Sequence, residues 1–363
     1  MIISDIKTYL LSVPYKDPPK IGFIDIGNID LLILEIETSS GLSGMGYLHP
    51  IVGGMQTIEM CIHEMLKPLI IGKNAENIEE LWKEMWKATF IQGRMGITVM
   101  GISAIDIALW DLLGKQKKQP LWQLWGGTNS PLPVYGSGCY RGLGHDGMIE
   151  KAKKFVSEGY KAIKMQVAWG FTHEEDVINV RDMRQELGNN IKIMIDVNQG
   201  WNAEEAIKFG KAIDDYNIEF IEEPVMADDF EGYQKIANSI NTPIATGENH
   251  FTHHDMKIFI ETEMVSTLQP DLMRGGYTEL KVISELANTN NIKIAPHLFM
   301  ELNTHLNASI PNASWLEHMG WYNHLWEEPV IPKNGKAKPH NKPGHGLKFK
   351  SELFKEFPYK NKV

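Results

Sequence analysis

Short apolar segments alternate with helical segments at a near-constant interval from residue 131 onwards, and this alternation limits the possible folds most strongly. We predict strands at residues 132–137, 162–167, 192–198, 219–224, 243–248, 266–271, 293–298 and 314–318. Strands that alternate with helices are typical of parallel sheets, and eight is the number of strands that closes a (β/α) barrel. The sequence therefore predicts an α/β protein with a TIM-like barrel, and an open doubly wound sheet is the alternative.

The first part of the chain mixes strands and helices differently. We predict strands at residues 2–12 and 30–38, helices at 56–71, 75–87 and 97–114, and, inside the barrel, a clear helix at 203–215. Glycines 41, 44 and 46 are expected to break the chain after the second strand. We expect one domain of residues 1–127, completed by about residues 326–363, and a barrel domain of residues 131–325.

The composition excludes some classes of partner. The formal net charge is −10, which disfavours nonspecific binding to nucleic acid or to an anionic membrane. A carboxylate substrate remains compatible, because one Lys or one metal ion can reverse the sign inside a pocket. Cys61 and Cys139 form no CxxC pair, so two reduced thiols in a cytoplasmic protein are expected. Neither a signal peptide nor an uninterrupted apolar run of about 18 residues is recognisable.

Three acids follow successive predicted strands at one constant spacing. Asp196, Glu222 and Glu248 are separated by 26 residues each, as expected for one carboxylate per βα unit. Carboxylates without Cys or His among them suit a hard cation such as Mg²⁺. A salt bridge or a helix N-cap is the ordinary explanation for any single acid, but it accounts less well for three acids in register.

Other polar side chains are predicted at the same end of the barrel. Asp271 can hydrogen-bond one nitrogen of His297 and so raise the basicity of the other nitrogen, although most of the 13 histidines are expected to be structural. Lys164 can neutralise a substrate carboxylate or pair with the acids. The alternation of a strand places Gln166 on the same face as Lys164, and Asn198 on the same face as Asp196. The histidines at positions 250, 253 and 254 are interpreted as surface residues, with a substrate-contacting loop as the alternative.

Residues 159–317 resemble the mandelate racemase and muconate lactonizing enzyme subgroup of the enolase superfamily. The resemblance rests on the segments GYKAIKMQV, IMIDVNQGW, FIEEP, ATGEN, LQPDLMRGGYTE, APHLFMELNTHL and SWLE, and it continues upstream through AIDIALWDLLGK and PLWQLWGG. It implies an N-terminal α+β capping domain on a (β/α)7β barrel. The segment Pro14–Gly27 resembles the specificity loop of the family, and members are often homo-octamers or dimers.

The resemblance also implies roles for individual residues. It implies Mg²⁺ held by Asp196, Glu222 and Glu248, a general acid/base dyad of His297 and Asp271, and a hydrogen bond from Glu317 to the carboxylate of the substrate. Lys164 would oppose the negative charge that develops on that carboxylate. Gln166 and Asn198 would hold the hydroxyl groups of a sugar acid.

One position departs from the family pattern. Many relatives carry Lys-x-Lys at the end of the second strand, whereas this chain carries Lys164-Met165-Gln166. A Gln amide does not titrate at working pH, so only His297 remains as a conventional base. Racemisation normally needs a base on each face of the substrate, whereas dehydration can proceed with one. We therefore expect dehydration of a sugar acid to a 2-keto-3-deoxy acid. Cycloisomerisation, epimerisation and a noncatalytic sugar-acid-binding role are the alternatives.

Overall fold

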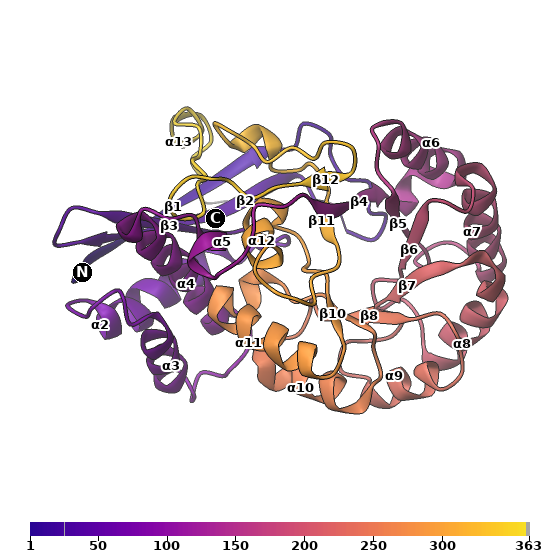
Figure 1. The fold of residues 1–363 in the computed structure, drawn as a ribbon, viewed down its shortest axis with the longest axis horizontal. Coiled ribbons are helices and arrows are strands. Elements are labelled where there is room, and N and C mark those ends of the chain that lie inside the picture. Colours follow the sequence, from indigo (N-terminus) through magenta and orange to yellow (C-terminus); the bar gives the residue numbers. More distant parts are fainter. Residues whose placement is uncertain (25, 361–363) are drawn as a thin grey trace.

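The computed structural model describes residues 1–24 and 26–360. The N-terminal part forms an antiparallel sheet in the order β1-β2-β3, which spans Ile3–Pro14, Asn28–Thr38 and Ser43–Leu48. The helices of this part are α1 Met55–Cys61, which continues as a π-helical turn Ile62–Leu66 and as α2 Lys67–Ile70, then α3 Ile78–Ala88 and α4 Ile97–Lys117. Helices α1 and α4 pack on the sheet, and α3 packs on α4. The expected α+β cap is confirmed, and Figure 1 shows it beside the barrel.

The prediction that glycines break the chain after β2 is right for Gly41, which lies in a turn, but wrong for Gly44 and Gly46, which lie inside a third strand, β3. The reason is the close packing of β3 on α4. A Cβ atom added at Gly44 would lie 2.1 Å from the carbonyl oxygen of Ala108, and one added at Gly46 would lie 2.2 Å from that of Ala104. Glycine is required at these two positions by the neighbouring helix, and the strand continues through both of them.

The remaining strands form one curled parallel sheet in the order β10-β9-β8-β7-β6-β5-β4-β11. The strands are β4 Leu132–Cys139, β5 Ala162–Gln166, β6 Lys192–Asp196, β7 Ile218–Glu222, β8 Ile244–Thr246, β9 Thr267–Leu268, β10 Lys293–Ile294 and β11 Leu316–His318. The helices between them are α6 Gly144–Ser157, α7 His173–Leu187, α8 Ala203–Ala212, α9 Phe230–Ala237, α10 Thr252–Thr262, α11 Gly276–Thr289 and α12 Met300–Asn307.

Backbone hydrogen bonds bring the two ends of this sheet together. The amide of Ile294 in β10 donates to the carbonyl oxygen of Asn312 at 2.9 Å, and the amide of Ser314 donates to the carbonyl oxygen of Ile294 at 2.8 Å. Residues 312–314 lead directly into β11, so the sheet closes on itself. The predicted (β/α)7β barrel is confirmed, with helices on its outside (Figure 1).

Several predicted elements differ in length from those in the structure. The last strands of the barrel are only two or three residues long, so Glu248, Asp271 and His297 lie on loops just after β8, β9 and β10. The predicted helix 203–215 ends at Ala212. The 120–127 junction contains a short helix, α5 Leu121–Leu124. Short segments complete the structure: β12 Lys336–Ala337, α13 Leu353–Glu356, and 3-10 turns at Arg141–Leu143, Asp214–Tyr216, Leu272–Arg274 and Asn323–Leu325.

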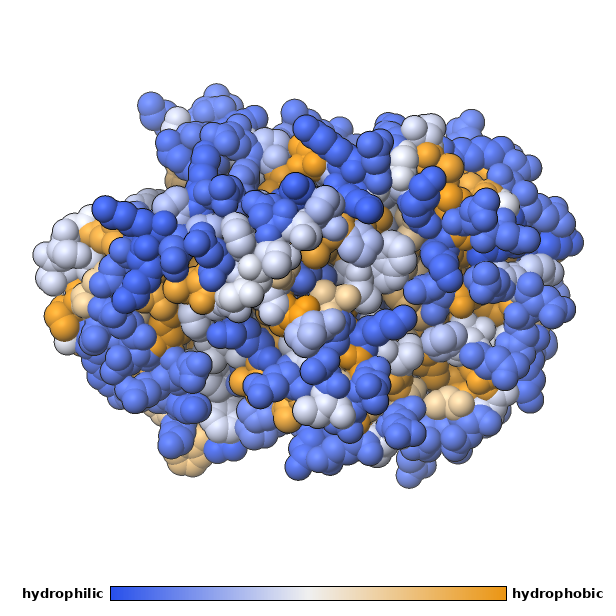
Figure 2. Space-filling model, viewed as in Figure 1, coloured by the Kyte–Doolittle hydropathy of each residue, from blue (hydrophilic) through white to orange (hydrophobic). Residues whose placement is uncertain are grey.

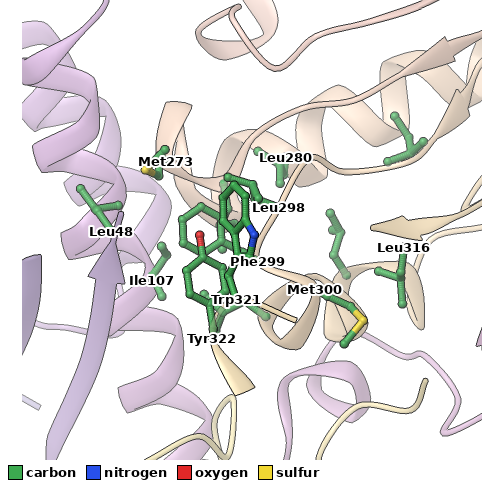
Figure 3. Packing of buried hydrophobic residues seen from close by; sticks show 14 of the residues in the cluster. Leu48, Ile107, Met273, Leu280, Leu298, Phe299, Met300, Leu316, Trp321 and Tyr322 are labelled. Atoms are coloured by element: carbon green, nitrogen blue, oxygen red, sulfur yellow. The ribbon is translucent and has the colours of Figure 1, made fainter. Parts of the chain in front are cut away.

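The cap and the barrel share one continuous apolar core. Leu48 of β3 and Ile107 of α4 face Phe299 and Tyr322 of the barrel side (Figure 3). The indole nitrogen of Trp82 in α3 donates to the carbonyl oxygen of Gly275 at 2.8 Å. This shared core holds the loops of the cap in a fixed position over the carboxyl ends of the barrel strands.

The C-terminal segment returns to the cap. The amide of Tyr359 donates to the carbonyl oxygen of Leu10 at 2.9 Å, and the amide of Ser12 donates to that of Phe357 at 3.0 Å. Figure 1 shows α13 beside the N-terminal sheet. Residues 357–359 therefore extend the hydrogen bonding of β1.

The surface is mostly hydrophilic in the view of Figure 2, with small apolar areas between charged side chains. One helix among the described residues, α4, is long and apolar enough to cross a membrane by length and composition, but 83% of its most apolar window is buried inside the protein. Burial in the core explains its hydropathy, and the helix gives only weak support for a membrane span.

We predict that Gly46→Ala lowers the free energy of unfolding by about 1–3 kcal/mol, because the new methyl group overlaps the backbone of α4. Thermal and urea unfolding of the variant measure the change. Gly27→Ala is the matched control, since no heavy atom lies within 4 Å of its added Cβ, and it should change stability by less than about 0.5 kcal/mol. Equal stability of both variants would contradict the tight β3–α4 contact.

Candidate active site

A buried ion cluster lies where the strands of the barrel end. The ammonium group of Lys164 donates to both carboxylate oxygens of Glu222 at 2.8 Å, lies 2.9 Å from Glu317 Oε1 and 3.4 Å from Asp196 Oδ2. Lys164 is only 4% exposed, and the three acids are also buried. One cation therefore faces three carboxylates in a place from which water is largely excluded.

Strand register explains why these side chains meet. Gln166 of β5 pairs with Asp196 of β6, and Asp196 pairs in turn with Glu222 of β7. Side chains at paired positions of parallel strands point to the same side of the sheet, so all three point into the mouth of the barrel. Glu248 reaches the same region from the loop after β8.

The buried acids repel one another, so additional positive charge between them would be stabilising. Burial raises the pKa of Glu222 well above its usual range, and the charges of Asp196 and Glu248 raise it further, against the opposing effect of Lys164. Burial and Glu248 also raise the pKa of Asp196. Carboxylate oxygens from three adjacent strand ends are the donors that Mg²⁺ prefers, so the residues present fit this ion.

The described residues form no ready-made cage of three or more metal ligands. Both oxygens of Glu222 are engaged, since Lys164 bonds to each and the side-chain amide of Gln269 donates to Oε2 at 2.6 Å. A cation that joined Asp196 and Glu248 would therefore have to share Glu222 with Lys164. Gln269 is absent from the predicted site, although it lies two residues before Asp271 and the alternation of a strand could have identified it.

Asp271 and His297 form the predicted pair. A parallel bridge joins their backbones, and His297 Nδ1 lies 2.7 Å from Asp271 Oδ2. The other oxygen of Asp271 accepts a hydrogen bond from the amide of Met273 at 2.7 Å, which fixes the carboxylate. The second ring nitrogen, Nε2, lies 3.4 Å from Glu248 Oε2 and is directed towards the acids.

The charge around His297 favours its protonated form. Burial lowers the pKa of His297, but the negative charges of Glu248 and Asp271 more than offset this effect and raise the pKa to about 10. Because the charge of Glu248 is one of the main causes of this rise, a cation held by Glu248 would lower the pKa again and free Nε2 to accept a proton.

Glu317 accepts hydrogen bonds in this structure. The amide of Leu298 donates to Oε2 of Glu317 at 2.9 Å, and Lys164 lies at Oε1. Burial raises the pKa of Glu317, but the charges of Lys164 and His297 outweigh it and lower the pKa to about 2. Donation of a hydrogen bond by Glu317, which the family resemblance implies, would first require that this carboxylate bind a proton.

Gln166 and Asn198 form a polar chain that ends at Asp196. The amide of Arg141 donates to Gln166 Oε1 at 3.2 Å, Gln166 Nε2 donates to Asn198 Oδ1 at 2.9 Å, and the amide of Asn198 donates to Asp196 Oδ1 at 3.0 Å. Asn198 has a positive φ of 48°, a conformation that Asn tolerates and that turns the chain sharply after β6. Both side chains are therefore held at the edge of the ion cluster.

Gln166 and Asn198 line a cavity of about 260 Å³ beneath the cap. The lining residues are Ile21, Phe23, Ile24, Ile26, Ile51, Ser137, Gly138, Cys139, Tyr140, Lys164, Gln166, Asp196, Asn198, Gln199, Glu223, Glu248, Asn249, His297, Met319 and Trp321. A larger cavity of about 780 Å³ lies beside it, but none of the strand-end acids lines that space. The smaller cavity is therefore the candidate active site.

The histidines of the loop after β8 differ from one another. His250 is buried, and its Nε2 lies 2.9 Å from the carbonyl oxygen of Ala227, so its assignment to the surface is wrong. His253 is half-buried against Glu279, and His254 is exposed. None of the three lines the cavity.

The fold and site define a barrel enzyme of one known class. Residues 5–126 match the sequence model of the mandelate racemase / muconate lactonizing enzyme N-terminal domain, and residues 147–353 match that of the enolase C-terminal domain-like family. The chain belongs to the mandelate racemase / muconate lactonizing enzyme family of the enolase superfamily.

Similar proteins act on sugar acids. The chain is 33% identical to the 3,6-anhydro-alpha-L-galactonate cycloisomerase of Streptomyces coelicolor, over 88% of this chain and 89% of the relative. It is 30% identical to the arabinonate dehydratase of Saccharolobus solfataricus, over 99% of this chain and 100% of the relative. The structure of an L-talarate dehydratase from Polaromonas sp. JS666, complexed with Mg and L-glucarate, matches with a TM-score of 0.89 and 28% identity, over 99% of this chain and 98% of that one.

We predict that Lys164→Met lowers the free energy of unfolding by about 3–5 kcal/mol without metal, because it leaves buried carboxylates without a counter-ion. Added Mg²⁺ should recover part of this loss by binding the folded state. Chemical unfolding with EDTA and with Mg²⁺ measures both effects. Lys192→Met is the control: its half-exposed ion pair with Glu219 should contribute less than about 1 kcal/mol. A loss no larger than that of the control would contradict the cluster.

Proposed function

We propose that this protein is a Mg²⁺-dependent enzyme that removes the proton α to the carboxylate of a sugar acid and then eliminates the oxygen on the β carbon. Dehydration to a 2-keto-3-deoxy acid is the preferred form of this reaction. The observation that carries the proposal is the pair of His297 and Asp271: the second ring nitrogen of His297, Nε2, is directed at the carboxylates that line the cavity.

The carboxylate of the substrate would bind beside Lys164 and the Mg²⁺ ion. We assign Asp196, Glu222 and Glu248 as the ligands of Mg²⁺. When bound, the ion supplies positive charge beside the substrate carboxylate, where negative charge develops after loss of the α proton. Lys164 adds a second positive charge on the same side, and Glu317 holds the ammonium group there through the 2.9 Å contact.

His297 would act first as the base and then as the acid. Nε2 takes the α proton, and the electron pair of the broken C–H bond leaves the negative charge on the carboxylate oxygens. The carbon–oxygen bond at the β carbon then breaks as a carbon–carbon double bond forms, and His297 returns the proton to the departing oxygen. The resulting enol becomes the 2-keto-3-deoxy acid. Asp271 holds the ring in place and stabilises its charged form.

The lack of a second imidazole or free amine among the described residues that line the cavity favours elimination over racemisation. Among the described residues that line the cavity, His297 is the only imidazole, and Lys164 is the only amine and is bonded to two carboxylates. Gln166 stands where a second base would be needed and is bonded to Asn198. We propose that Gln166 and Asn198 hold hydroxyl groups of the substrate.

Cycloisomerisation is the second candidate, favoured by the likeness to the 3,6-anhydro-alpha-L-galactonate cycloisomerase. In a 3,6-anhydro acid, the ring oxygen is attached to the carbon β to the carboxylate. Loss of the α proton would then expel the ring oxygen instead of a hydroxide ion, and the same protonated His297 would convert it to a hydroxyl group. The product would be an isomer of the substrate, so the two candidates differ only in the leaving group.

We retain three further assignments as proposals. The division into residues 1–127 with about 326–363 and residues 131–325 agrees with the C-terminal contacts to β1. A cytoplasmic location agrees with Cys61 and Cys139, which are buried and unpaired. Assembly into a dimer or octamer follows from the family resemblance.

We predict that His297→Asn abolishes turnover, because Asn cannot take the α proton, while Mg²⁺ still binds to the unchanged carboxylates. Product formation and Mg²⁺ titration by calorimetry measure the two properties. His254→Asn is the control, since His254 is exposed and does not line the cavity, and it should retain full activity. Dehydration retained in His297→Asn would refute the role of the dyad.

We predict that one sugar acid or a few related ones yield a 2-keto acid in the presence of Mg²⁺, and that EDTA prevents it. Semicarbazide absorbance detects the keto acid across a library of mono-acids, di-acids and anhydro acids. Product mass separates the candidates, because dehydration removes one water and cycloisomerisation conserves the mass. A product that forms equally well in EDTA would contradict the metal-dependent mechanism. Loss of α deuterium without a keto acid would favour epimerisation.

A further inference from the structure

The active-site cavity has two chemically different sides. Most of its polar lining residues follow the barrel strands β5 to β10. The described lining residues that come from the cap are all apolar, and we call them the apolar roof: Ile21, Phe23, Ile24, Ile26 and Ile51. All five come from the cap, on the loops that follow β1 and β3. A ligand that fills the cavity must therefore contact both kinds of surface.

Packing holds the apolar roof in place. Phe23 stacks on Trp169 of the β5–α7 loop, with ring centroids 5.0 Å apart and planes at 25°. The indole nitrogen of Trp169 donates to the carbonyl oxygens of Val197 and Asn198, which anchors this contact to the end of β6. Ile26 is buried in the core, and Ile51 packs against the core as well.

No described residue of the apolar roof can receive a charged or hydroxyl group of the substrate. The positively charged or titratable nitrogen groups that line the cavity belong to Lys164 and His297, both on the barrel side. Arg141 packs close to Gly22 of the β1–β2 loop but does not line the cavity. A hydroxyl or carboxylate placed against the roof would lose its water without gaining a partner, which is unfavourable.

We propose that the substrate is a mono-acid whose far end, opposite the reacting carboxylate, is apolar, such as the terminal methyl of a 6-deoxy acid or the ring CH₂ of an anhydro acid. This inference rests on the proposed function for the placement of the reacting carboxylate at the acids. The cavity volume of about 260 Å³ agrees with a compact ligand, because it lies just below the roughly 300 Å³ at which typical ligand pockets begin.

The test uses acids that differ only at C6: 6-deoxygalactonate, galactonate and galactarate, with the same three forms in the gluco and manno series. Calorimetry in Mg²⁺ gives the Kd of each, and kcat/KM is measured wherever turnover occurs. In the series that binds tightest, we expect the methyl form to be preferred about 10-fold over the hydroxymethyl form and about 100-fold over the dicarboxylate.

Ile24→Thr and Ile51→Thr should each reduce the preference of the methyl form over the hydroxymethyl form several-fold, because the new hydroxyl group can serve as a partner. Ile331→Thr is the matched control, since Ile331 is exposed and does not line the cavity, and it should leave the ratio unchanged. The comparison of the acids that differ at C6 uses the unmodified protein, so it tests the inference even if a roof variant fails to fold.

The inference is overturned if the hydroxymethyl or dicarboxylate form binds as tightly as the methyl form, or if none of the acids binds. Tightest binding of the dicarboxylate would mean that a cation reaches the far end of the ligand, contrary to the inference. Because Kd is measured separately from turnover, failure of the proposed chemistry can be distinguished from failure of the proposed selectivity. Acids that bind in the expected order without exchange of the α proton would refute the proposed function and leave the selectivity of the cavity intact.

Discussion

The carboxylates at the mouth of the barrel set the main energetic constraint on this structure. Three buried acids share the single ammonium group of Lys164, and their repulsion is only partly balanced. Such a cluster is unfavourable in an interior of low polarity unless more positive charge is added. The same repulsion favours the binding of additional positive charge at this position. Stability and function therefore oppose each other at this position, as is common at active sites.

Loops of the cap line one part of the cavity beside this cluster. Within the cap, Gly44 and Gly46 allow the backbones of β3 and α4 to approach closely. The shared core around Phe299 and Tyr322 then joins the cap to the barrel (Figure 3). Exclusion of water strengthens every charge interaction in the cavity, so packing far from the acids influences their chemistry.

The sequence predicts the barrel side of the site well because that side depends on local periodicity. The alternation of a strand places Lys164 and Gln166 on one face, and the 26-residue spacing places the acids on successive strands. The sequence allowed Lys164 to pair with one of the proposed metal ligands beside its role towards the substrate, but its contact with Glu317 was not predicted, because distances between strands are not encoded locally. The sequence analysis does not predict the third strand of the cap. A glycine that allows close packing cannot be distinguished, from the sequence alone, from a glycine that ends a strand.

The two sides of the cavity are constrained to different degrees, and this difference explains how chemistry and selectivity can be separated. Asp196 and Glu222 lie at paired positions of buried strands, so any change there disturbs a charge balance that supports the fold. Ile24 and Ile51 lie on connecting loops and contribute only partly to the core. Loops tolerate substitution better than buried strand ends. A chain built this way can keep proton abstraction α to a carboxylate while its loops determine which acid reaches the base.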